Sequence, residues 1–394
     1  MSAFDSSKRT FVCGEGTMLT DALGHELFDA TSSIWTIVHG HGRPEIVAAI
    51  ARQAATLDHS TLLGATHPRA EELAERLCAL ASMDYAFFSS DGASAIEVAA
   101  KMALRYWAVN GQPQRTRFVR LDHAYHGDTA AAMSLSDITI FKEQYGALTF
   151  EAFPFDASAT ILMQDDIAAV IVEPLVQAAA GILTVPTMMY APMRDMQPLL
   201  IVDEIATGFG RTGTFFASEQ LALQPDLMCV GKGLTGGVLA LSATLTTQRI
   251  YDAFLAEHAA MRQFFHGHSF AGNPIACAAA LASIELFDRN STLAAAARIH
   301  DRIVVHLRKL VGHSAIRATR LVGTMTGIEL RSESLDAGTA KSGAWRIADL
   351  MYERGHFTRP IGDVVQLVPP LTTSDAEIDA FFDVFSDALE QACI

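Results

Sequence analysis

The chain has 394 residues, of which 50% are hydrophobic and 19% charged. This composition excludes a disordered chain, and the length indicates two or three domains. There are 29 Lys and Arg against 44 Asp and Glu, a net charge of −15. Such an acidic chain is a poor nucleic-acid binder, because that binding depends on neutralising phosphates.

The sequence shows no feature of a secreted or membrane protein. Five cysteines occur without CxxC spacing, and the first residues, MSAFDSSKRTFVCGEG, carry no apolar run of the signal-peptide kind. The most apolar stretch, Ile167 to Pro186, is interrupted by Glu173 and Gln177. We therefore expect a cytoplasmic protein with reduced thiols and no membrane span.

Short apolar runs alternate with helical patterns along most of the chain, which predicts an α/β fold with a largely parallel sheet. The runs are unbroken rather than alternating, as in strands that are covered on both faces. The predicted strands are Tyr85–Phe88, Phe118–Leu121, Ala168–Val172, Leu199–Val202, Leu227–Val230 and Ser242–Thr246.

A predicted helix over Gly92 to Trp107 follows the first of these strands. Its start contains Gly92, Ala93 and Ser94, and free backbone N–H groups at a helix start can hold a phosphate. A simple N-cap by Ser90 or Asp91 would explain the same residues.

The segment LDHAYHGDT follows the strand that ends at Leu121. His123, His126 and the more distant His67 lie in no HExxH or CxxC pattern, so we expect no metal site. Tyr125 fits better as an aromatic residue that stacks on a ring.

The segment LLIVDEIATGFGRTG places Asp203 directly after a predicted strand. A carboxylate at the end of a buried strand needs a cation nearby, and ligands bind at this end of open α/β sheets. The same residue is equally consistent with a cap on the next helix.

Lys232 likewise follows a predicted strand, in PDLMCVGKGLTGG. A lysine in apolar surroundings has a lowered pKa and can attack a carbonyl as the neutral amine. A lysine that simply emerges into solvent would give the same pattern.

The tail of the chain predicts a smaller domain. Ser291–Gly312 and Asp375–Cys393 have helical patterns, and Gly323–Leu330 reads as a strand. We expect residues 1–40 to join this domain, so that the chain divides into 1–40, 41–287 and 288–394.

Together these groups match what pyridoxal phosphate (PLP) needs: an amine for its aldehyde, an acid for its ring nitrogen, a phosphate cup and a stacking ring. The residues from about Gly16 to Thr373 resemble the class III aminotransferases, which are PLP-dependent transferases of fold type I. The most specific segments are DEIATGFGRTG and GKGLTGG, with Lys232 placed 29 residues after Asp203. The resemblance implies a mostly parallel, mixed sheet covered by helices, and a smaller α+β domain.

The resemblance also implies a role for each matching residue. Lys232 would bond the cofactor and move the substrate proton, and Asp203 would pair with the ring nitrogen. Ile205 and Tyr125 would contact opposite faces of the ring, and Gln177 would lie near its hydroxyl oxygen.

The phosphate would be held by Gly92, Ala93 and Ser94. Ser269, in HGHSFAGNP, matches a residue that the neighbouring subunit supplies in this family. The resemblance thus implies a homodimer with shared active sites.

Four segments resemble the biotin-pathway members of the class more closely. That resemblance implies 8-amino-7-oxononanoate as acceptor, S-adenosylmethionine or lysine as donor, and substrate contacts from Trp35, Asp128, Arg359 and Gln366. The four segments are SSIWTIVHGHGRPEI, AYHGDT, VEPLVQAAAGI and LSATLTT.

Other features depart from the biotin-pathway pattern. The His-Pro-Tyr segment near the start is missing, Ile34 replaces a tryptophan, and Gln366 and Leu371 are closer to general class III enzymes. The stretch Thr187–Gln197 is trimmed to a helix of barely ten residues. A general ω-aminotransferase, another PLP reaction such as racemisation, and a non-catalytic PLP-binding scaffold therefore remain open.

Overall fold

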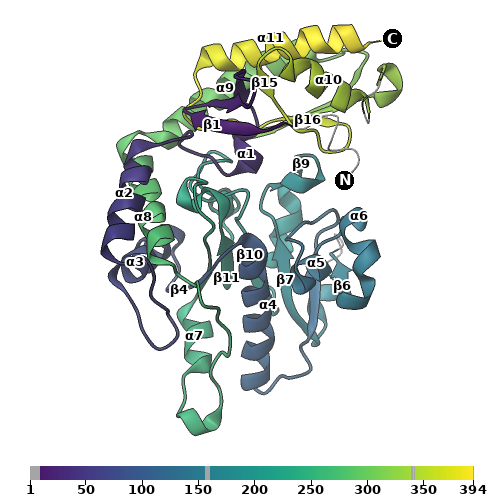
Figure 1. Ribbon diagram of the computed structural model, residues 1–394. Helices are drawn as coiled ribbons and strands as arrows, with labels where there is room; N and C mark the ends of the chain where they lie inside the picture. The colour runs from purple at the N-terminus through teal and green to yellow at the C-terminus, as the bar shows by residue number, and fades with distance from the viewer. Residues whose placement is uncertain (1–8, 156–159, 339, 341, 394) are drawn as a thin grey trace.

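The computed structural model describes residues 9–155, 160–338, 340 and 342–393. A large domain surrounds a central sheet, and a smaller domain formed by both ends of the chain lies against it (Figure 1). None of the helices in the described ranges is long and apolar enough to cross a membrane.

The central sheet has seven strands in the order β4-β12-β11-β10-β7-β5-β6. Strand β12 runs antiparallel to both of its neighbours, and the other neighbouring pairs are parallel. The sheet is therefore mixed and mostly parallel, as predicted. The strands are β4 (Tyr85–Ser89), β5 (Arg117–Arg120), β6 (Ala152–Pro154), β7 (Ile167–Val172), β10 (Leu199–Asp203), β11 (Leu227–Val230) and β12 (Ser242–Thr246).

Helices cover both faces of this sheet, and every residue of β7, β10 and β11 is buried. On one face lies α4, whose apolar side packs on the middle strands. The other face carries α3 and α8. The helices of the large domain are α2 (Pro44–Thr56), α3 (Pro68–Ala81), α4 (Gly92–Val109), α5 (Ala130–Leu135), α6 (Thr139–Lys142), α7 (Gln248–Phe254) and α8 (Pro274–Arg289).

The smaller domain joins the two ends of the chain in one core. Phe28 and Ala30 pack with residues such as Ile299, Leu330 and Phe381. Its sheets have the orders β1-β2-β3-β15 and β13-β14-β16. The elements are β1 (Phe11–Glu15), β2 (Met18–Asp21), β3 (Glu26–Asp29), α9 (Thr292–Leu310), β13 (Ile316–Val322), β14 (Met325–Leu330), α10 (Gly343–Tyr352), β15 (His356–Phe357), β16 (Val364–Leu367) and α11 (Asp375–Ala392).

Two further features bear on the sequence predictions. The trimmed segment after residue 186 forms only a short 3-10 helix, η5 (Thr187–Met193). It follows a two-stranded hairpin, β8 (Val176–Gln177) and β9 (Leu183–Thr184). The predicted domain limit at 287 falls within α8, and the domain limits stay a prediction.

Candidate active site

A pocket of about 380 Å³ lies at the carboxyl ends of β7, β10 and β11, where strand ends, loops and the start of α4 meet. This is the edge at which ligands bind in open α/β sheets. Its lining residues are Trp35, Asp91, Gly92, Ala93, Tyr125, His126, Gly127, Asp128, Thr129, Glu173, Ala178, Ala179, Asp203, Ile205, Ala206 and Lys232.

Asp203 is the last residue of β10, and the residue is 4% exposed. Oδ1 accepts a hydrogen bond from the backbone N–H of Ile205 at 3.0 Å, and Oδ2 lies 2.7 Å from Nδ1 of His126. His126 is itself buried, and its Nε2 has no hydrogen-bond partner in the described part of the chain. The carboxylate is thus oriented at two points while it faces the pocket.

Lys232 comes two residues after β11 and has a positive φ of 43°, a backbone conformation that residues other than glycine seldom adopt. Its side chain lines the pocket, with Nζ 5.3 Å from the centre of the Trp35 ring. Burial lowers the pKa of the amine, against the opposing effects of Asp203 and Glu173. The alternative of a lysine that emerges into solvent is therefore wrong.

Glu173 is a pocket residue that we did not predict. It follows β7, and its Oε2 accepts from the N–H of Tyr125 at 3.0 Å. Burial, and then the charge of Asp203, raise the pKa of Glu173 well above its usual value. Its position directly after a buried parallel strand is the signal that identified Asp203, and the same signal could have identified Glu173.

Tyr125 and Ile205 both line the pocket, and so does Asp128. The pKa of Tyr125 is raised by burial and by the nearby carboxylate of Asp128, to which its hydroxyl is hydrogen-bonded. Asp128 therefore lines the pocket and contacts Tyr125, the residue predicted to stack on the cofactor ring.

The start of α4 contributes Gly92 and Ala93 to the pocket. Asp91 caps the helix, accepting from both the N–H and the hydroxyl of Ser94 at 2.9 Å. The N–H groups of Gly92 and Ala93 belong to the first turn, where no intrahelical acceptor exists. A Cβ at Gly92 would lie 2.9 Å from Cγ2 of Ile205, so a larger residue here would displace the Ile205 side chain.

Five predicted residues lie outside the lining of the pocket, and the first is Ser94, which is hydrogen-bonded to Asp91. Gln177 is buried and donates to the carbonyl of Asp122 at 2.6 Å. Ser269 and Arg359 are exposed. Gln366 is fully buried and contacts the pocket through another residue, accepting from Trp35 Nε1 at 2.7 Å. Their roles toward cofactor or substrate stay predictions.

Trp35 reaches the pocket from an uncommon backbone conformation. The four-residue element α1 (Ser32–Trp35) has φ values of 48°, 49°, 64° and 67°, so it is a left-handed turn. Left-handed helical backbone costs roughly 1–2 kcal/mol per residue for L-amino acids. Such a turn therefore depends on tertiary contacts that fix it in place.

Comparison with known proteins places this site in a family. The class III aminotransferase family model matches residues 4–389. The chain belongs to the class III aminotransferases. It is 36% identical to an adenosylmethionine-8-amino-7-oxononanoate aminotransferase of Aquifex aeolicus, over 97% of this chain and 91% of that protein.

Two solved structures share the fold of this aminotransferase over its whole length. One is the adenosylmethionine-8-amino-7-oxononanoate aminotransferase of Methanocaldococcus jannaschii, with a TM-score of 0.92, 34% identity and 95% of that chain covered. The other is an amine transaminase from an uncultivated Pseudomonas species in a PLP-bound form, with a TM-score of 0.92, 31% identity and 97% covered. Fold type I is thereby confirmed.

The cofactor of this enzyme is pyridoxal phosphate, and the pocket fits it. Lys232 supplies an amine with a lowered pKa, and Asp203 supplies a buried, oriented carboxylate. The start of α4 offers free N–H groups to an anion. These three groups border one pocket and match the aldehyde, the ring nitrogen and the phosphate.

Proposed function

We propose that this aminotransferase transfers an amino group to 8-amino-7-oxononanoate, giving 7,8-diaminopelargonate, with S-adenosylmethionine or lysine as donor. The carrying observation is Asp128 on the pocket wall beside Tyr125, in the AYHGDT segment that resembles the biotin-pathway enzymes. The names of the two similar proteins from A. aeolicus and M. jannaschii support the same substrate.

The residues of the pocket divide the chemical work. PLP, when bound, supplies a positively charged ring that withdraws electrons from the substrate. Lys232 binds at the aldehyde carbon and moves a proton at the substrate carbon, for which its lowered pKa suits it. Asp203, oriented by His126, balances the charge on the ring nitrogen.

Glu173 complements this arrangement because burial and the charge of Asp203 raise its pKa and so favour its protonated form. A protonated Glu173 adds no second negative charge beside Asp203. Asp203 therefore remains the carboxylate that determines the charge of the ring nitrogen.

A general class III amine aminotransferase is the second candidate. Ile34, Gln366 and Leu371 favour it, since all three depart from the biotin-pathway pattern. The 31% identity to an amine transaminase also supports it. In this case Trp35 and Asp128 would border a pocket for a simple amine.

We further propose a cytoplasmic homodimer with shared active sites. Ser269 is exposed on a segment that includes Phe270, 63% exposed, and that passes close to Leu63, 60% exposed. Burying such apolar side chains favours association. We expect analytical ultracentrifugation to find a dimer. The variant Ser269→Ala should have a lower affinity for PLP and should remain dimeric.

Product analysis tests the substrate directly. The protein with PLP is incubated with 8-amino-7-oxononanoate and one donor at a time, which is S-adenosylmethionine, lysine or β-alanine. The Lys232→Ala variant serves as the blank. We expect mass spectrometry to find the diamine with one of the first two donors. Conversion of simple amines without any diamine would support the second candidate instead.

A further inference from the structure

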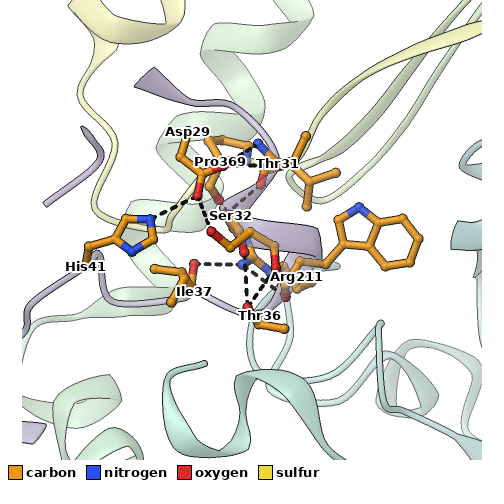
Figure 2. A network of polar contacts seen from close by, with 11 residues as sticks. Asp29, Thr31, Ser32, Thr36, Ile37, His41, Arg211 and Pro369 are labelled. Carbon is orange, nitrogen blue, oxygen red and sulfur yellow. Dashed lines mark hydrogen bonds and ion pairs between the residues drawn. The ribbon is translucent and has the colours of Figure 1, made fainter. Parts of the chain in front are cut away.

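Arg211 is a buried arginine that no catalytic role accounts for. It is 1% exposed, and it lies outside the pocket lining. Its guanidinium donates to three backbone carbonyls (Figure 2): Pro369 at 2.6 Å, Ile37 at 2.9 Å and Trp35 at 3.3 Å. Burying a charged group on neutral acceptors is costly, so this arrangement calls for a structural purpose.

The three carbonyls come from two distant parts of the chain. Trp35 and Ile37 lie at and just after the end of the left-handed turn α1, whereas Pro369 follows β16 of the smaller domain. Arg211 itself belongs to the loop after β10. One side chain therefore joins the pocket's own strand–loop segment to both parts of the smaller domain.

The rest of the turn is held by other groups. Asp29, fully buried, accepts from the N–H and hydroxyl of Thr31 at 3.2 Å and from the hydroxyl of Ser33 at 2.9 Å (Figure 2). The hydroxyl of Ser32 donates to Val368 at 2.6 Å. These contacts fix the beginning of the turn. Backbone hydrogen bonds join its end to this beginning, from the N–H of Trp35 to Thr31 and from the N–H of Ile37 to Ser32, and Arg211 ties the carbonyls of that end to the rest of the fold.

Trp35 is thereby fixed through its backbone as well as through its ring. The indole donates to Gln366, and the ring lies above the amine of Lys232. We propose that Arg211 is a positioning residue, which holds the end of the left-handed turn so that Trp35 forms the wall of the substrate pocket. Only the substrate part of its test rests on the proposed amino-transfer function.

The variant Arg211→Lys tests this proposal because lysine keeps the charge but cannot span three carbonyls in a fixed fork. The chain has three tryptophans. In protein labelled with 5-fluorotryptophan they give three ¹⁹F NMR signals, and Trp35→Phe identifies the one from Trp35. We expect Arg211→Lys to shift or broaden that signal alone.

Arg115→Lys is a matched control. Arg115 is also buried, donates to the carbonyl of Ile167 at 2.8 Å, and lies 4.5 Å from the ring centre of Trp107. We expect its substitution to move the Trp107 signal and leave the Trp35 signal in place. A Trp35 signal unchanged in Arg211→Lys, or moved equally in Arg115→Lys, would overturn the proposal.

A kinetic measurement separates positioning from general loss of structure. With 1-phenylethylamine as a large donor, we expect Arg211→Lys to change KM about tenfold, as the loss of one or two buried hydrogen bonds implies, and kcat much less. With β-alanine as a small donor the KM should change little. The difference should vanish in a Trp35→Ala background, and persistence there would contradict a role through Trp35.

Two provisions keep the test decisive. If Arg211→Lys does not fold, Ile34→Gly is added, since glycine adopts the positive φ of this position freely, and the NMR comparison is made against Ile34→Gly alone. If the wild-type protein converts neither amine, the second candidate function fails for these donors. The NMR result still decides the role of Arg211.

Discussion

The floor and the wall of the pocket are built in different ways. The floor consists of Asp203, Glu173 and Lys232, which lie at or just after the ends of neighbouring buried strands of one sheet. The wall around Trp35 comes from a left-handed turn that is tied to β16 and to the loop after β10. The floor is therefore fixed by the sheet, and the wall by a few tertiary hydrogen bonds.

This difference separates chemistry from selectivity. Groups at strand ends keep their positions as long as the sheet is intact, whereas a strained turn can move when one hydrogen bond is lost. We therefore expect substitutions in the floor to remove the reaction, and substitutions in the wall to change which substrate is accepted.

The largest effect is expected for Lys232→Ala, which removes the only pocket lysine among the described residues. Turnover should fall on the order of 10⁴-fold or more, because no other amine there can bond the cofactor or move the proton. The visible absorption of the loaded enzyme should be lost as well. A variant that turns over at nearly the wild-type rate would show that the floor has been wrongly assigned.

Asp203→Asn should have the next largest effect, because it leaves a positive ring nitrogen without its buried partner. Breaking a buried charge pair costs about 3–5 kcal/mol, and we expect kcat to fall accordingly. The control is Glu204→Gln, next in the chain, whose carboxylate is buried on Thr207 and Ser218 away from the pocket. Equal losses in both variants would indicate general damage to the strand end.

Asp128→Asn tests a second part of the pocket wall, the loop between β5 and α5. We expect kcat/KM for 8-amino-7-oxononanoate to fall about tenfold, and that for a simple ω-amine to fall much less, because only the larger acceptor needs a charged partner at this position. Separate kinetic assays with each substrate measure the two losses. Equal losses on the two substrates would exclude a role for Asp128 in acceptor choice.

The pH dependence of cofactor binding sharpens the description of the floor. Only the neutral amine of Lys232 can capture PLP, so the capture rate should rise with pH and level off above its lowered pKa, and so below pH 10.5. Asp203 raises that pKa, so Asp203→Asn should move the midpoint to lower pH. Stopped-flow absorbance of apoprotein mixed with PLP measures both curves, and a midpoint that moves upward would contradict this electrostatic account.

Glu173→Gln should have the smallest effect. Burial favours the protonated form of Glu173, which resembles an amide in charge and shape, and the amide oxygen can still accept from the N–H of Tyr125. We expect kcat at pH 7 to change by less than about threefold, a free-energy difference no larger than that of one typical hydrogen bond. A loss as large as that of Asp203→Asn would mean that Glu173 works as a charged group.

The sequence predicted the floor better than the wall for a physical reason. Asp203 and Lys232 follow unbroken apolar strands, and that local pattern places both at one edge of the sheet. Glu173 obeys the same rule, but it was interpreted only as an interruption of an apolar run. The start of α4 was also predictable, with Ser90 or Asp91 as its cap, and the structure shows that Asp91 is the capping residue.

The support of the wall could not be predicted from local patterns. No glycine marks the left-handed turn at Ser32–Trp35, since its φ values are imposed by contacts from elsewhere. Trp35 and Gln366 are 331 positions apart, and Arg211 lies 176 positions from Trp35. The resemblance identified Trp35 and Gln366, and the structure adds that Gln366 contacts the pocket through Trp35.

The central claim is that the cofactor-binding floor is functional although the substrate-binding wall departs from the biotin-pathway pattern. Its most direct test is the absorption spectrum of the purified protein with PLP. It is recorded before and after adding S-adenosylmethionine, lysine or a simple ω-amine in separate cuvettes. We predict a visible band that bleaches with S-adenosylmethionine or lysine. Bleaching with the simple amine alone would contradict the proposed substrate, and the absence of any band with excess PLP would contradict the assignment of the floor itself.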